Sequence, residues 1–265
     1  MKNIHPYYER FKTIISDPTN DLIKKVINAG FIRNGIVKMY NGIKVYQNCY
    51  YDSFSDIFWL NKGIHEPQEE YIFNEIISKL DKPKVMVELG SYWAFYSLSM
   101  KAKHPDCICY CVEPSLEGLE KGKLNFKLNN YDALFFNELV GNGHLRLDDW
   151  ILPQIDVLHC DIQGYEFEML QGAYKLLYEQ KINYIFLSLH TQDLFYTCLE
   201  SLKTFDYHII FSVDMNDTFC EDGIIVASSP LMPKYDYQLA KRTETQIISD
   251  DKMLEIYNEA IKNVM

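Results

Sequence analysis

The chain has 265 residues, a formal net charge of −11 at neutral pH, and 48% hydrophobic residues. This length allows one large domain with an accessory part, and the apolar content is enough for a substantial core. The acidic balance argues against a general nucleic-acid binder, which would present a basic surface. No stretch approaches the roughly 18 apolar residues of a membrane-spanning helix. We therefore expect no nucleic-acid partner and no membrane span, and the pattern leaves the oligomeric state open.

The cysteines indicate a reducing environment. There are seven of them, an odd number, without the close spacing of a disulfide framework. Cys107, Cys109 and Cys111 alternate along one expected strand, so we interpret them as buried strand residues rather than metal ligands. The first residues lack the charged segment and apolar run of a secretory signal. We therefore expect a cytoplasmic protein.

Residues 1–82 are predicted to form an accessory segment of helices and a β-hairpin. One or two short helices are expected before residue 30, because apolar residues recur at helical spacing over 22–27. Two apolar runs flank Asn41 and Gly42, a strong hairpin signal within residues 35–49. A helix is expected from Glu66 to Leu80, with Pro67 in its first turn.

Residues 83–230 alternate between short apolar runs and helical patterns, which predicts a doubly wound, mostly parallel sheet of about seven strands. The strands are expected at 85–89, 107–112, 133–140, 155–160, 183–189, 207–213 and 223–228. Helices are expected after the first, second, fourth and fifth strands, the third of them over 165–178 and the fourth over 193–204. The last two strands have no helix between them, so the last strand should run antiparallel. Residues 231–265 are expected to form a tail with a helix over 250–263, whose apolar face carries Met253, Leu254, Tyr257 and Ile261.

Ligands of doubly wound sheets bind outside the carboxyl ends of the strands, so chemistry is expected there. The first strand ends at Glu88 and Gly90, where a glycine turn leads into a helix N-terminus. The second strand ends at Glu113, a carboxylate that can accept hydrogen bonds from both hydroxyls of a ribose. The pattern favours a nucleotide-like ligand.

The fourth strand ends at Asp161 and the fifth at His190, which would be neighbours if these strands are adjacent. Such a pair can orient an imidazole for proton abstraction or ligate a divalent metal. A purely structural pair is the alternative. A hydrolase triad would need a G-x-S-x-G turn and a nicotinamide site a G-x-G-x-x-G turn, and residues 90–95 fit neither.

Four stretches together resemble the FkbM family of S-adenosylmethionine-dependent methyltransferases, and the resemblance covers roughly residues 60–230. They are Val-Glu-Leu-Gly-Ser at 87–91 with Tyr-Ser at 96–97, Val-Glu-Pro-Ser at 112–115, Leu-Asp-Asp at 147–149, and the block at 156–173 that contains Asp-Ile-Gln-Gly-Tyr-Glu. Tyr92 and Ala94 stand where the family usually has Asn and Gly, Gln163 replaces an acid, and His159-Cys160 replaces the usual Lys.

The resemblance implies a Rossmann-like class I methyltransferase that transfers a methyl group to a hydroxyl oxygen of a small molecule, expected to be a sugar or glycoconjugate. Asp161 and His190 are predicted as the catalytic base and its orienting partner. The residues predicted to bind S-adenosylmethionine are Glu88, Gly90, Ser91, Tyr92, Ser97, Glu113, Pro114, Asn137, Glu138 and Asp161. A divalent metal at Asp161, His190 and Glu166 is not favoured. The alternative is an inactive relative in which residues 92–94 have closed the cofactor pocket.

Overall fold

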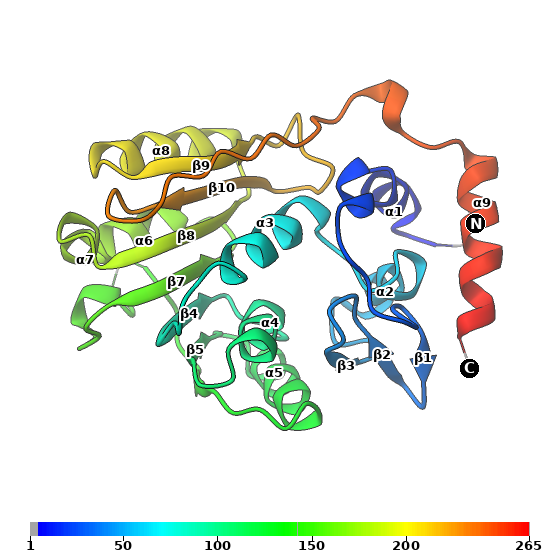
Figure 1. Cartoon of the computed structure of the whole chain (residues 1–265), viewed down its shortest axis with the longest axis horizontal. Coiled ribbons are helices and arrows are strands. Elements are labelled where there is room, and N and C mark those ends of the chain that lie inside the picture. The colour runs from blue at the N-terminus through cyan, green and yellow to red at the C-terminus, as the bar shows by residue number, and fades with distance from the viewer. Residues whose placement is uncertain (1–4, 142, 265) are drawn as a thin grey trace. The chain divides into compact units, whose positions relative to one another are not determined.

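A computed structural model describes residues 5–141 and 143–264; residues 1–4 of the predicted accessory segment and residue 265 of the predicted tail lie outside it. The chain forms two units (Figure 1). Unit 1 contains the chain up to Ser78, Phe219–Glu221, and the chain from Leu239 onward. Unit 2 contains Lys79–Thr218 and Asp222–Gln238.

Unit 2 is built on a seven-stranded sheet in the order β6-β5-β4-β7-β8-β10-β9. The strands are β4 (Val85–Leu89), β5 (Ile108–Val112), β6 (Leu134–Phe136), β7 (Ile155–Cys160), β8 (Ile182–Leu189), β9 (His208–Val213) and β10 (Gly223–Ser228). The strands from β6 to β8 pair in parallel, whereas β10 is antiparallel to both of its neighbours. This sheet confirms the predicted doubly wound, Rossmann-like fold and its antiparallel last strand.

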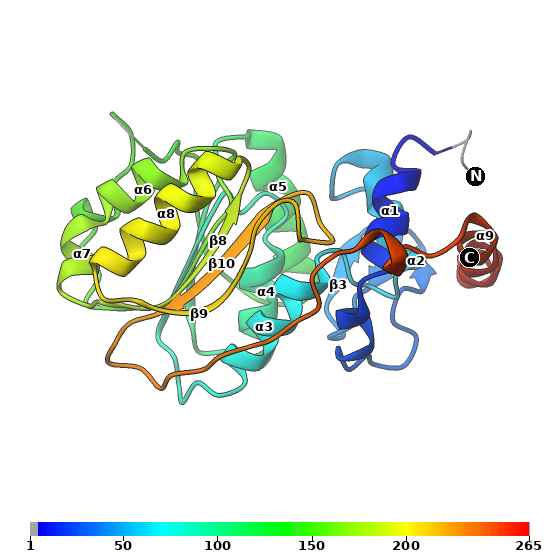
Figure 2. The ribbon, with the colours of Figure 1, turned by 90° about the horizontal axis from the view of Figure 1, so that it is seen from above.

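Helices cover both faces of this sheet (Figure 2). One face carries α4 (Phe95–Lys103) and α5 (Leu116–Leu128), and the other carries α6 (Glu166–Gly172), α7 (Tyr174–Tyr178) and α8 (Gln192–Thr204). Side chains alternate along β4, so Val85, Val87 and Leu89 join the apolar core beneath α6–α8. Glu88 consequently faces the side of the sheet that α4 covers.

The chain reverses its direction of winding between β4 and β7. From β4 it proceeds through β5 to β6 on one side, and then returns to form β7 on the other side of β4. The carboxyl ends of β4 and β7 therefore flank the switch point, where open α/β sheets bind their ligands.

Two predicted elements of unit 2 are shorter or broken. The strand expected over 133–140 is limited to Leu134–Phe136, because Asn137 turns back to bond the carbonyls that follow β5. The helix expected over 165–178 is interrupted at Ala173, whose φ of −111° and ψ of 14° are not helical. The predicted helix 193–204 is observed as α8.

Unit 1 contains a small antiparallel sheet and several short helices. The elements are α1 (Tyr8–Ile15), β1 (Ile32–Arg33), β2 (Ile36–Lys38), β3 (Lys44–Tyr46), α2 (Ile57–Leu60), α3 (Pro67–Ile77) and α9 (Asp250–Ala260). Strands β2 and β3 form the predicted hairpin, with Gly42 at a φ of 91° in its turn. Pro67 occupies the first turn of α3, as expected.

Short helical segments are observed before residue 30, as expected, but residues 22–27, whose apolar spacing suggested a helix, do not form one. The helical segments lie earlier, in α1 and in a 3₁₀ turn over Pro18–Asp21. The N–H groups of Val26 and Gly30 bond to the carbonyls of Tyr40 and Lys38, so this backbone pairs with the hairpin instead of coiling. Ile27, counted toward an apolar face, is 83% exposed.

The tail helix is shorter than expected. It ends at Ala260 and continues as a 3₁₀ turn over Ile261–Asn263. Its predicted apolar face is only partly buried: Met253 is fully buried, whereas Leu254 and Ile261 are exposed. Within the described parts of the chain, the helices all lack the length and apolar character that crossing a bilayer requires.

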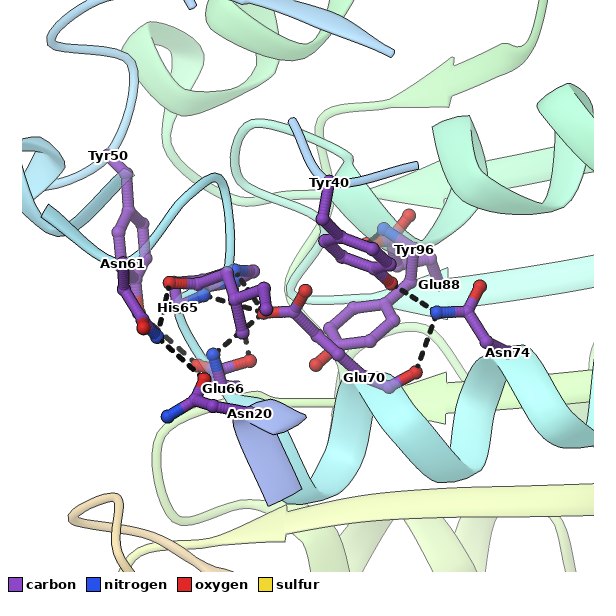
Figure 3. Close-up of polar contacts among 11 residues, drawn as sticks. Asn20, Tyr40, Tyr50, Asn61, His65, Glu66, Glu70, Asn74, Glu88 and Tyr96 are labelled. Carbon is purple, nitrogen blue, oxygen red and sulfur yellow. Dashed lines mark hydrogen bonds and ion pairs between the residues drawn. The ribbon is translucent and has the colours of Figure 1, made fainter. Parts of the chain in front are cut away.

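A buried polar cluster lies at the start of α3 (Figure 3). The Nδ1 atom of His65 is 2.7 Å from Oε1 of Glu70, and His65 Nε2 is 3.4 Å from Oε2 of Glu66. Oε1 of Glu70 also accepts the backbone N–H groups of His65 and Glu66, each at 2.7 Å. The side chain of Glu70 therefore closes the first turn of α3, where N–H groups lack helical partners.

Candidate active site

Gly90 lies at the switch point and allows a close backbone contact. Its φ is 72°, and a Cβ placed on it would lie 1.7 Å from the carbonyl oxygen of Asp161. Asp161 is held in place because its N–H donates to the Leu89 carbonyl at 2.9 Å. The requirement for glycine at this turn therefore comes from the neighbouring loop after β7.

The turn after Gly90 has an unusual backbone. Tyr92 and Ala94 adopt left-handed conformations with φ values of 42° and 61°. For residues other than glycine this costs about 1 kcal/mol each. The N–H groups of Gly90 and Ser91 both donate to the Val112 carbonyl at 2.9 Å, which ties the turn to the end of β5. The hydroxyl of Ser91 is buried there without a hydrogen-bond partner.

Glu88 caps helix α4. Its two carboxylate oxygens accept the N–H groups of Tyr96 at 3.3 Å and Ser97 at 2.9 Å. Burial raises the pKa of Glu88, and the opposing influence of His159 and of the Ser97 contacts is smaller. Glu88 and Ser97, two residues predicted to bind the cofactor, therefore contact each other and hold the start of α4 beside the turn.

Glu113 occupies the end of β5 and holds two loops together. Its Oε2 accepts the N–H of Tyr92 at 3.0 Å, and its Oε1 accepts the N–H of Ser115 at 2.8 Å. Burial raises the pKa of Glu113, while these two hydrogen bonds lower it. Each carboxylate oxygen can accept a second hydrogen bond, so the group keeps capacity for a hydroxyl ligand.

The side chain of Tyr92 packs on helix α5 beside this carboxylate. A Cβ on Gly118 would lie 2.5 Å from Cδ2 of Tyr92 and 3.3 Å from Cδ of Glu113. Lys121 donates to the Tyr92 hydroxyl at 3.2 Å, and its Nζ lies 5.2 Å from the ring centroid. The absent side chain at Gly118 is therefore what accommodates the large residue at position 92.

The remaining predicted cofactor residues lie at the same edge of the sheet. Asn137, after β6, donates to the carbonyls of Glu113 at 3.0 Å and Pro114 at 2.8 Å. Pro114 and Glu138 are exposed. Asn137 therefore positions the Glu113 loop, and its exposed neighbour Glu138 is open to a ligand.

The structure brings Asp161 and His190 together, as the adjacent strands β7 and β8 predict. Oδ1 of Asp161 lies 3.3 Å from Nε2 of His190. Gln163 contacts both: its Nε2 donates to Asp161 Oδ1 at 3.0 Å and lies 2.8 Å from His190 Nε2. Oδ1 of Asp222 lies 3.4 Å from the same nitrogen.

Glu166 approaches the other side of the imidazole. Its Oε1 is 3.5 Å from His190 Nδ1 and accepts the N–H groups of Ile162 at 3.0 Å and Gly164 at 3.2 Å. Glu166 is fully buried, and its Oε2 has no hydrogen-bond partner. This carboxylate therefore shapes the loop after β7 and also faces the ring.

The carboxylates around His190 favour its protonated form. Partial burial lowers its pKa, but hydrogen bonds to Asp161 and Glu166 and the charge of Asp222 outweigh that effect and raise the pKa to about 10. An imidazolium cannot accept a proton, so Asp161 is the member of this pair whose chemistry suits a base.

Asp222 is the site residue that the sequence reading missed. It precedes β10, and Gly223 pairs with Leu189 in the antiparallel register. The amino end of β10 thus lies at the sheet edge where the parallel strands have their carboxyl ends. The signal was present, because the Asp/Asn-rich loop between β9 and β10 leads directly to that edge.

One ligand atom from each of Asp161, Glu166 and His190 lies within 4.8 Å of the other two. A carboxylate, a second carboxylate and an imidazole at such distances form a donor set that divalent cations use. All of these residues belong to unit 2.

Comparison with known proteins gives one family match. Residues 143–209 match the Methyltransferase FkbM domain, a segment of about a quarter of the chain that contains both Asp161 and His190. The match confirms the predicted resemblance over that segment, while the turn at 87–98 and Glu113 lie outside it. Among curated proteins, no match is found.

Three solved structures illustrate what the chain is similar to. Precorrin-6y C5,15-methyltransferase from Geobacter metallireducens GS-15 is 18% identical and has a TM-score of 0.48, covering 62% of this chain and 90% of that one. TrmK from M. capricolum, in complex with S-adenosyl-homocysteine, is 15% identical with a TM-score of 0.42, covering 73% and 95%. Magnesium protoporphyrin IX methyltransferase from Synechocystis PCC 6803, with bound SAM, is 12% identical with a TM-score of 0.46, covering 61% and 77%. These TM-scores are below 0.5, so the fold assignment depends on the sheet topology itself.

Proposed function

We propose that the chain is an S-adenosylmethionine-dependent methyltransferase that methylates a hydroxyl oxygen of a small molecule, in particular a sugar or glycoconjugate. The observation that carries the proposal is the Asp161–His190 pair at the carboxyl edge of the sheet. It lies in the segment that matches the FkbM methyltransferase domain, one strand from the Gly90 turn.

The residues around the switch point fit the cofactor. Glu113 retains lone pairs for ribose hydroxyls at the end of β5, and Glu138 and Pro114 are exposed beside it, where the adenine would bind. The unpartnered hydroxyl of buried Ser91 is a further hydrogen-bonding group at the Gly90 turn. Asp161 and the backbone of residues 90–92 complete the set at the methionine end.

Methyl transfer to a hydroxyl requires that the hydroxyl be aligned with the methyl group and that a nearby group accept its proton. S-adenosylmethionine, when bound, supplies a methyl group on an already activated sulfonium leaving group. The chain must then orient the acceptor hydroxyl for in-line attack and receive its proton. Asp161 is the acceptor of that proton, and the imidazolium of His190, fixed by Glu166, orients the Asp161 carboxylate.

The test is transfer of a labelled methyl group from S-adenosylmethionine to a panel of hydroxylated sugars. Asp161→Asn keeps the shape of the side chain but removes the base, so turnover should fall by about 10²–10⁴-fold. Asp193→Asn, an exposed carboxylate in the first turn of α8, is the matched control and should leave turnover unchanged. Equal turnover in wild type and Asp161→Asn would remove Asp161 as the base.

A second function, an inactive relative with a closed cofactor pocket, is favoured by one observation. The ring of Tyr92 packs on Gly118 next to Glu113, whose two oxygens already accept backbone N–H groups. If this ring closes the pocket, Tyr92→Ala should create S-adenosylhomocysteine binding that the wild type lacks. If the wild type binds S-adenosylhomocysteine and Tyr92→Ala binds it equally or more weakly, the hypothesis of a closed cofactor pocket is contradicted.

A further inference from the structure

The groups around Nε2 of His190 have the spacing of metal ligands. Asp161 Oδ1, Asp222 Oδ1 and the Gln163 amide lie 3.3, 3.4 and 2.8 Å from that nitrogen, and Asp161 Oδ1 lies 3.0 Å from the amide. Adjacent ligands of an octahedral ion with bonds of about 2.1 Å are roughly 3 Å apart. Asp161, Asp222 and Gln163 therefore each lie about one ligand-to-ligand distance from Nε2, and Asp161, Glu166 and His190 each offer a ligand atom within 4.8 Å of the other two.

The net negative charge of the cluster also favours the binding of a cation. The carboxylates of Asp161, Glu166 and Asp222 all lie within 3.5 Å of one imidazole ring. A single imidazolium balances only one of these charges. Glu166 is fully buried with an oxygen that has no hydrogen-bond partner, and such a carboxylate is costly to bury unless positive charge is close.

The contact between Glu166 and Nδ1 of His190 matches a second feature of metal sites. A metal-bound histidine usually donates its other ring N–H to a carboxylate, which fixes the tautomer and the ring orientation. Here Glu166 Oε1 lies 3.5 Å from Nδ1, an ion-pair contact rather than a hydrogen bond, and Nε2 is directed toward Asp161, Asp222 and Gln163. The amide of Gln163, turned over, presents its carbonyl oxygen to the same point.

We propose that Asp161, His190, Asp222 and Gln163 bind one divalent cation, which replaces the proton on Nε2 of His190 and releases it to solvent, with Glu166 orienting the imidazole. Oxygen donors with a single imidazole suit Mn²⁺ or Mg²⁺ better than the thiolate-rich or histidine-rich sites of zinc and copper. The cation would bind the acceptor hydroxyl and lower its pKa, a role that rests on the proposed function. Cation binding itself does not depend on that function.

The test uses Mn²⁺ alone as the probe and follows the disappearance of free Mn²⁺ by electron paramagnetic resonance. The full-length chain should bind one Mn²⁺. His190→Gln and Asp222→Asn should each weaken binding at least about tenfold, and Glu166→Gln should weaken it by about 10–100-fold. Asp193→Asn removes one charge nearby without touching the cluster and should bind like wild type.

Equal affinity in wild type and both His190→Gln and Asp222→Asn, or no binding by a folded wild type, would overturn the proposal. Circular dichroism on each variant shows that it is folded, and Asp222→Asn and Glu166→Gln preserve side-chain shape. S-adenosylhomocysteine binding is measured on the same samples. Mn²⁺ binding without S-adenosylhomocysteine binding contradicts the proposed function alone, and the reverse result contradicts the metal site alone.

Discussion

Each unit of the chain contains a histidine surrounded by carboxylates. The two clusters differ in the exposure of the histidine and in its distances to the carboxylate oxygens. In unit 1, His65 is 2% exposed and pairs with fully buried Glu70 at 2.7 Å (Figure 3). In unit 2, His190 is 18% exposed, and its closest carboxylate oxygens are 3.3–3.5 Å away. In the first cluster two carboxylates, Glu66 and Glu70, contact the ring, whereas in the second three carboxylates share one ring.

The difference shows how to separate a structural ion pair from a site. Glu70 uses the same oxygen for the His65 ring and for two backbone N–H groups at the start of α3, so its contacts stabilise a helix end. His190 follows a strand at the ligand-binding edge of a sheet, and its neighbours come from separate loops. Removing the Glu70 carboxylate should therefore lower the free energy of unfolding, whereas removing a carboxylate beside His190 should impair binding or turnover.

The largest expected effect is on Glu70. Glu70→Gln leaves the buried imidazole of His65, whose pKa is raised by Glu70 and Glu66 against the lowering effect of burial, without its main counter-charge. Breaking a buried pair in this way should lower the free energy of unfolding by about 3–5 kcal/mol, measured by urea denaturation. Glu259→Gln, an exposed carboxylate of α9 in the same unit, is the control and should cost less than about 0.5 kcal/mol.

The same denaturation series applied to the open cluster completes the comparison. Asp222→Asn removes one of three like charges around His190 and should change the free energy of unfolding by less than about 0.5 kcal/mol. A loss for Asp222→Asn as large as for Glu70→Gln would show that the His190 cluster is a structural ion pair.

A smaller effect, of opposite sign, is expected at Asp17, a buried carboxylate in unit 1. Burial raises its pKa from 3.8 to about 6, although hydrogen bonds from Thr19 lower it. Because the folded-state pKa lies above the unfolded value, stability is lost as pH rises from about 4 through 6. Asp17→Asn keeps an acceptor for the Thr19 N–H and should raise the free energy of unfolding at pH 7.5 by about 2 kcal/mol.

At pH 4 the same substitution should change the free energy of unfolding by far less, since Asp17 is then largely protonated in the folded state. Asp21→Asn, the exposed carboxylate at the end of the same 3₁₀ turn, serves as the control at both pH values. A stability change that is independent of pH would show that the Asp17 charge is not the cause.

Much of the sheet could be predicted from the sequence because each strand is bounded by local signals. The apolar run before Gly90, the Glu-Pro after β5 and the block after β7 are each read within a few residues. The absence of a helix at 22–27 could not be predicted, because it depends on the backbone N–H of Val26, which bonds to the carbonyl of Tyr40 in the hairpin. A periodicity count cannot detect a competing pairing from a distant segment.

The residues at the strand ends could be predicted from the sequence, but the contacts between them could not. Strand adjacency places Asp161 beside His190, and the structure brings them together. The roles of Glu88 and Gly90 in holding helix α4 and the Asp161 loop depend on packing between elements, which single-residue patterns do not encode. Asp222 joins the site only because β10 pairs antiparallel with β8, which places Gly223 opposite Leu189.

Calorimetric titration with S-adenosylhomocysteine tests the central claim most directly. Wild type should bind one equivalent, and Glu113→Gln should bind about tenfold more weakly, because a neutral amide makes weaker hydrogen bonds to ribose hydroxyls than a carboxylate does. Glu117→Gln, an exposed carboxylate in the first turn of α5, should bind like wild type. No binding by wild type, or equal binding by wild type and Glu113→Gln, would contradict the placement of the cofactor at the Gly90 turn.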